Sequence, residues 1–98
     1  MSIDTTRVDP THRQLILAQV NDERVRQDAR WGHLDCSPFE YLAVLVEEVG
    51  EVARAIHDVR FCDAVPGAAD LRSELIQVAA VAVQMIERLD TGRMPWLI

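Results

Sequence analysis

Apolar residues recur along the chain at every third or fourth position in three segments, which turn-forming residues separate. This spacing is typical of amphipathic helices, and no stretch keeps the strict alternation of a strand. The pattern predicts helices over about residues 11–30, 38–60 and 69–90, followed by a C-terminal tail over 91–98. We therefore expect residues 1–98 to form a single all-α domain.

Capping residues set the ends of these helices. Asp9 or Thr11 can cap the first helix, next to a proline that suits the first helical position. The second helix has the clearest start, because "SPFE" places Ser37 at the cap and Glu40 three residues later, which is a capping box. Gly92 can end the third helix in the left-handed conformation.

The apolar faces differ between the first and third helices. In the first, apolar residues are dense near Leu15 and Leu17 and thin out later, so we expect its second half to be half-solvated. From Leu75 to Ile86 the third helix is apolar on nearly every side, which predicts burial all round, partly against another subunit. A chain of this length buries only about 60 to 70 % of its surface, so we expect a homo-oligomer.

Composition narrows the class of protein. The net charge of −6 and the scattering of the ten basic residues, all Arg, argue against a nucleic-acid groove. No apolar run is long enough to span a bilayer, and "MSIDTTRVDP" lacks the features of a signal peptide. We expect a cytoplasmic protein without a membrane partner, in which Cys36 and Cys62 are reduced thiols.

Acidic residues cluster in the middle of the second helix. The stretch "LVEEVGEVARAI" puts Glu47, Glu48 and Glu51 within little more than one turn. At about 100° per residue, Glu47 and Glu51 share a stripe with Arg54 and Asp58, and Glu48 stands about 60° beyond Glu51. Because like charges at this spacing repel, the cluster requires either a solvated face or a cation.

The third helix carries a second polar set on one face, Asp70, Glu74 and Gln77. The segments "EVGEVA" at 48–53 and "ELIQVA" at 74–79 both read Glu, two residues, a polar residue, then Val-Ala. If the two faces oppose each other, their oxygen atoms converge on a site suited to Mg²⁺ or Mn²⁺. A di-iron site requires Glu-x-x-His, and no histidine has Glu three residues before it. The alternative is that each face is simply solvated.

The order and spacing of these segments resemble those of a known family. "EEVGE" at 47–51 and "ELIQ" at 74–77 resemble the EExxE and ExxD motifs of the MazG-like, all-α nucleoside triphosphate pyrophosphohydrolases, and "ERVRQDARWG" at 23–32 resembles the segment preceding the first motif. The resemblance covers about residues 20–90. It implies an antiparallel helical bundle completed as a homodimer or a dimer of dimers, with the active site near the subunit interface. It also implies Mg²⁺-dependent hydrolysis of a nucleotide's α,β-phosphoanhydride to the monophosphate and pyrophosphate.

The resemblance also implies roles for individual residues. Glu48, Glu51 and Glu74 match metal-binding positions, and Glu47 matches a glutamate that is either a ligand or a base for water. Gln77 stands where the motif has aspartate, which weakens the charge of the site.

Two interpretations of Gln77 remain. Either Asp70, one turn before Glu74, restores the negative charge and activity is retained, or the site holds fewer ions. In the second case the chain is a non-catalytic helical oligomer that keeps the fold for nucleotide binding or assembly.

Candidate substrate contacts come from residues around the acidic cluster. Trp31 either stacks on the nucleobase, as an aromatic does in this family, or closes the core beneath a loop. Four residues are phosphate candidates by proximity in sequence: Arg30, His33, Arg54 and Arg72. The alternative for the arginines is pairing with neighbouring carboxylates.

Overall fold

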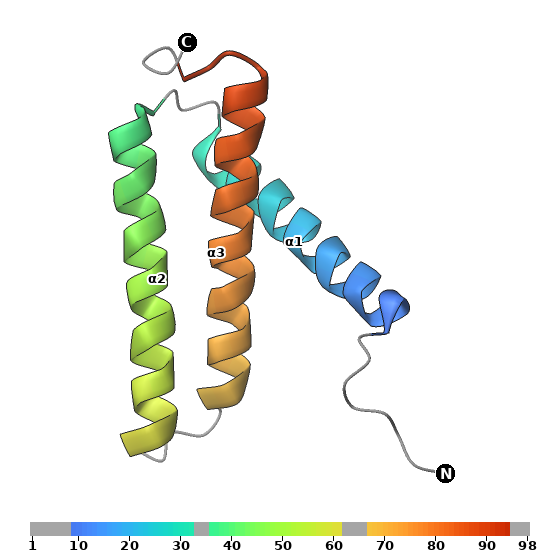
Figure 1. Cartoon of the computed structure of the whole chain (residues 1–98), viewed down its shortest axis with the longest axis vertical. Helices are drawn as coiled ribbons and strands as arrows, with labels where there is room; N and C mark the ends of the chain where they lie inside the picture. The colour runs from blue at the N-terminus through green and yellow to red at the C-terminus, as the bar shows by residue number, and fades with distance from the viewer. Residues whose placement is uncertain (1–8, 33–35, 62–66, 95–98) are drawn as a thin grey trace.

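The structure is a computed structural model that describes residues 9–32, 36–61 and 67–94. These residues form three helices, α1 (Pro10–Trp31), α2 (Pro38–Phe61) and α3 (Gly67–Asp90), and contain no strand. The helices α2 and α3 lie side by side and antiparallel, whereas α1 crosses them obliquely and its N-terminal half projects away (Figure 1). The all-α prediction is confirmed, and α3 begins two residues earlier than predicted.

The predicted caps are present. The Asp9 side chain accepts a hydrogen bond at 2.9 Å from the backbone N–H two residues later. The capping box of α2 is reciprocal, since the Glu40 N–H donates to Ser37 Oγ at 3.2 Å and the Ser37 N–H donates to Glu40 Oε1 at 3.0 Å. Gly92 adopts a φ of 69° just after α3, as predicted, and Gly32 adopts 63° just after α1. Local chemistry therefore sets the helix ends.

The core between the helices is thin. Among the described residues, the buried hydrophobic side chains are Val20, Tyr41, Ala55, Ala80, Val81 and Met94. Tyr41 ties α2 to α3, because its hydroxyl accepts a hydrogen bond at 3.1 Å from Nε of Arg88. Met94 docks the start of the predicted tail on the core, and residues 95–98 lie outside the described residues.

The second half of α1 is half-solvated, as expected, but the apolar first half is not the part that is buried. The buried residues of α1 are Val20, Arg24 and Gln27, whereas Leu15 and Leu17 in its first half are 54 % and 59 % exposed. Polar contacts explain this difference, and the spacing of apolar residues cannot predict them. Arg24 contributes hydrogen bonds to α3 and within α1.

Two apolar surfaces are largely exposed to solvent in the part of the chain that the structure describes. On α3, Leu75 and Ile86 are 51 % and 55 % exposed, so burial all round is not achieved within one chain. On α2, five apolar residues at helical spacing form an outer stripe, and each of them is 50–68 % exposed. The residues of this stripe are Phe39, Leu42, Val46, Val49 and Ile56. Within the described part of the chain, no helix combines the length and apolar character needed to cross a membrane.

Candidate metal centre

Glu48 lies on the face of α2 that packs against α3. It stands one heptad after Tyr41 and one heptad before Ala55, and both of these residues are buried. Glu74 has the corresponding place on α3, one heptad before the fully buried Val81. Residues seven apart share a helix face, so both carboxylates belong to the seam between α2 and α3.

Each of these two glutamates has one buried oxygen atom without a hydrogen-bond partner. The atoms are Oε2 of Glu48 and Oε2 of Glu74, and they come from facing helices. Burying a carboxylate oxygen without a partner is unfavourable, since the oxygen loses its water and gains nothing in return. A proton or a cation between the helices would remove this cost.

The two carboxylates also act on each other electrostatically. Burial raises the pKa of Glu48, and the negative charge of Glu74 is the next largest cause, followed by the charges of Glu47, Glu51 and Glu23. An effect of Glu74 on Glu48 requires the two side chains to be close across the seam. This effect supports the predicted convergence of α2 and α3 carboxylates for this pair, and the metal site itself stays a prediction.

Glu23 on α1 is a contributor to which the sequence interpretation gave no role. Its side chain is only 18 % exposed, and its charge raises the pKa of Glu48. It opens the segment "ERVRQDARWG", so the resemblance of that segment was the signal that could have identified it. The acidic centre thus receives a carboxylate from each of the three helices.

The other predicted ligands differ in exposure. Glu47 and Glu51 are exposed, Gln77 is half-buried, and Asp70 is exposed in the first turn of α3. In the ranges that the structure describes, no group of three His, Cys, Asp or Glu side chains is arranged to hold a metal ion. The carboxylates whose charges raise the pKa of Glu48 are, from the largest effect to the smallest, Glu74, Glu47, Glu51 and Glu23. The ligand set of a metal ion stays a prediction.

The predicted substrate contacts that the structure describes are exposed side chains. The Arg30 guanidinium lies 5.8 Å from the centroid of the Trp31 ring, which is a cation–π contact, and Trp31 is 38 % exposed. Trp31 follows Glu23 by eight residues, which is about 12 Å along a helix. Arg54 is exposed on α2, and His33 lies outside the described residues. The roles of Trp31, Arg30 and Arg54 in substrate binding stay predictions.

No family model matches this chain, and comparisons with curated proteins and with solved structures find no match either. The acidic centre and the motifs that contain it are therefore the features of the chain that point to a function.

Proposed function

We propose that the chain is a Mg²⁺-dependent nucleoside triphosphate pyrophosphohydrolase of the MazG-like type, with Mn²⁺ as a possible substitute. The observation that carries the proposal is the facing pair of buried, unpartnered oxygen atoms on Glu48 and Glu74. Carboxylate oxygens are the donors that Mg²⁺ prefers, and Mg²⁺ reaches its substrates through phosphates. The substrate class comes from the resemblance of "EEVGE" and "ELIQ" to the motifs of that family.

In this proposal each acidic residue has a role that follows from its position. Glu48 and Glu74 hold the ion from opposite sides of the seam, with Glu51 and the carbonyl oxygen of Gln77 as further donors. Bound there, Mg²⁺ would neutralise charge on the substrate phosphates and make a nearby water more acidic. Glu47, the exposed residue next to Glu48 in the chain, is our candidate for the base that accepts the proton of that water.

With Gln77 in place of aspartate, the motif has one negative charge fewer. We propose that the negative charge of Glu23 compensates for this loss. The charge of Glu23 raises the pKa of Glu48 even though Glu23 also pairs with Arg26 at 2.8 Å, whereas Asp70 is exposed in the first turn of α3. On this interpretation the site retains enough negative charge for a divalent ion.

Homo-oligomerisation is part of the same proposal. The outer stripe of α2 repeats with the three-and-four spacing by which helices pack on one another, and each of its residues is at least half exposed. A second copy of the chain, brought to the stripe by a two-fold axis, would bury both stripes at once. We propose a dimer as the smallest assembly.

The test is release of pyrophosphate from a panel of ribonucleoside and deoxyribonucleoside triphosphates with Mg²⁺ or Mn²⁺. Glu48→Gln should lower turnover by at least about 100-fold, since losing even an outer-shell partner of a metal ligand typically costs 10- to 100-fold. Asp90→Asn, an exposed position at the end of α3, is the matched control and should retain activity. Gln77→Asp should tighten Mg²⁺ binding.

Two outcomes count against the proposal. Absence of turnover by the wild-type chain on the whole panel favours the non-catalytic helical oligomer. Turnover that is equal in wild type and Glu48→Gln shows that the activity lies elsewhere.

A further inference from the structure

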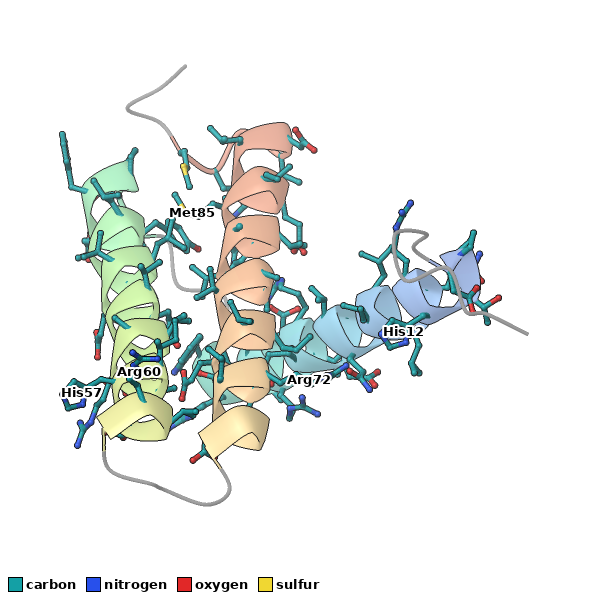
Figure 2. The ribbon with its side chains drawn as sticks, turned by 60° about the horizontal axis from the view of Figure 1, so that its bottom comes forward. His12, His57, Arg60, Arg72 and Met85 are labelled. Carbon is teal, nitrogen blue, oxygen red and sulfur yellow. The ribbon has the colours of Figure 1, made fainter. Side chains whose placement is uncertain are left out.

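A groove of about 380 Å³ lies between α1 and α3, and its volume is within the range of roughly 300–1,000 Å³ for small-molecule sites. One face of α1 forms one wall, and the early turns of α3 form the other. Figure 2 shows Arg72 on α3 beside the place where α1 crosses it. The lining residues are Gln19, Asp22, Glu23 and Arg26 from α1, and Arg72, Ser73 and Ile76 from α3.

The polar groups of this groove are balanced in charge. Arg26 pairs with Glu23 at 2.8 Å, and Arg72 and Asp22 supply one further charge of each sign. A groove with two guanidinium groups and two carboxylates favours neither a free anion nor a free cation. It fits a neutral moiety that both donates and accepts hydrogen bonds.

Arg72 has N–H groups that can donate hydrogen bonds to a ligand. Its Nη2 donates to the neutral Gln19 Oε1 at 2.6 Å, which fixes the guanidinium across the groove, and among the described residues no carboxylate lies within ion-pair distance of it. A guanidinium has five N–H groups and a flat face. Arg72 can therefore bond to Gln19 and to a ligand at once.

The groove adjoins the acidic centre through Glu23. This residue lines the groove, and its charge also reaches Glu48 in the seam. A ligand whose phosphates bind at the acidic centre would therefore have its other end near the groove.

We propose, on the basis of the function proposed above, that this groove binds the nucleoside part of the substrate. The nucleobase lies against the Arg72 guanidinium plane and the Ile76 side chain, since bases stack on arginine planes as well as on aromatic rings. Asp22 and Ser73 bond to sugar hydroxyl or base-edge groups. Base selection then depends on the α1–α3 groove, and Trp31 is not needed for it.

The experiment is a ¹H–¹⁵N NMR titration of the full chain with nucleoside 5′-monophosphates, in the presence of a chelator so that no metal is involved. Backbone signals of Gln19, Ser73 and Ile76 should shift at millimolar ligand. Arg72→Ala should raise the dissociation constant at least tenfold, and Arg72→Lys should give an intermediate value because it keeps the charge and loses the planar fork. Arg13→Ala, an exposed arginine outside the groove on α1, should leave the constant unchanged.

Several results would overturn the groove assignment: shifts centred on Trp31, no shifts at all, the same shifts with inorganic phosphate, or unchanged affinity in Arg72→Ala. The titration is independent of the turnover assay. If pyrophosphate is released but the groove signals do not shift, only the nucleoside-binding role of the groove is contradicted. If the groove signals shift but no pyrophosphate is released, only the proposed catalysis is contradicted.

Discussion

Glu48 places a charge on a helix face that otherwise packs small or apolar side chains. Its neighbours one heptad away, Tyr41 and Ala55, are 3 % and 7 % exposed, and one of its own oxygen atoms is buried without a partner. Burial and the charge of Glu74 both oppose ionisation, so they raise the pKa of Glu48. Such unfavourable placement at a site is typical of residues kept for function and not for stability.

Replacing Glu48 by Gln should therefore stabilise the metal-free protein. The amide keeps the shape of the side chain and removes its buried charge. This removal should raise the free energy of unfolding by on the order of 1 kcal/mol, which corresponds to roughly 4 to 8 °C in melting temperature for a domain of this size. The measurement is thermal unfolding with a chelator at neutral pH. Because the pKa of Glu48 is raised in the folded state, protonation favours folding, and the gain should shrink as the pH falls through that pKa.

Mg²⁺ supplies the complementary measurement. It should raise the melting temperature of the wild type and leave that of Glu48→Gln unchanged, by the linkage of binding to folding. If Glu48→Gln has a lower melting temperature than the wild type with the chelator present, the Glu48 carboxylate stabilises the metal-free fold, and the prediction is wrong.

At the scale of the helices, the docking of α1 on α3 depends on a polar network. Arg24 is 5 % exposed and donates to both carboxylate oxygens of Glu87 at 2.9 and 2.7 Å, to Asp28 at 2.9 Å and to Gln27 at 3.2 Å. The hydrogen bonds with Arg24 lower the pKa of Glu87, and the hydrogen bond to Glu87 raises the pKa of Arg24. Both shifts favour the charged pair.

Arg24→Ala should loosen this contact. We expect a loss of about 1–3 kcal/mol in the free energy of unfolding, because buried Gln27 and both carboxylates lose a donor. Urea denaturation measures it, with Arg26→Ala as the matched control: Arg26 also pairs with a glutamate on α1 but is 66 % exposed, and it should cost less than about 1 kcal/mol.

The pH dependence of this contact has the opposite sign to that of Glu48. The lowered pKa of Glu87 contributes stability above the ordinary glutamate value of about 4.3. That stability is lost as the pH falls through the lowered pKa of the folded state.

The mutation test has a clear negative outcome. If Arg24→Ala and Arg26→Ala lower the free energy of unfolding equally, Arg24 has no special role in docking α1 on α3.

At the scale of the whole molecule, one chain leaves too much apolar surface in water. The outer stripe of α2 and the exposed Leu75, Ile86 and Leu89 of α3 contrast with a core of only six buried hydrophobic side chains among the described residues. Apolar patches of this kind mark surfaces where macromolecules associate. The proposed dimer covers the α2 stripe.

Val46→Glu should dissociate that dimer, because it places a charge in the middle of the stripe. Sedimentation or light scattering at several concentrations measures the mass. Val25→Glu on α1 is the matched control, since both valines are 60 % exposed and only Val46 belongs to the stripe. The wild-type melting temperature should also rise with protein concentration, and Val46→Glu should abolish that rise. A wild type that stays monomeric at every concentration would contradict the assembly.

The sequence by itself determined the helices, their ends and the acidic motif. Capping and helical periodicity act within a few residues, so Ser37, Glu40 and Gly92 could be interpreted without knowing the fold. The opposition of Glu48 and Glu74 was also predictable, since each lies one heptad from residues that a helix pair would bury. The family assignment, the ion and the reaction stay predictions.

Only the tertiary structure decided which side chains from distant parts of the chain share a space. It brought Glu23 near enough for its charge to raise the pKa of Glu48, docked α1 through Arg24 instead of its apolar first half, and formed a groove between α1 and α3 that Gln19 and Arg72 line. These contacts join residues far apart in sequence and depend on how α1 crosses α3 (Figure 1). A crossing angle results from side-chain packing over a whole helix face, and no local pattern of residues encodes it.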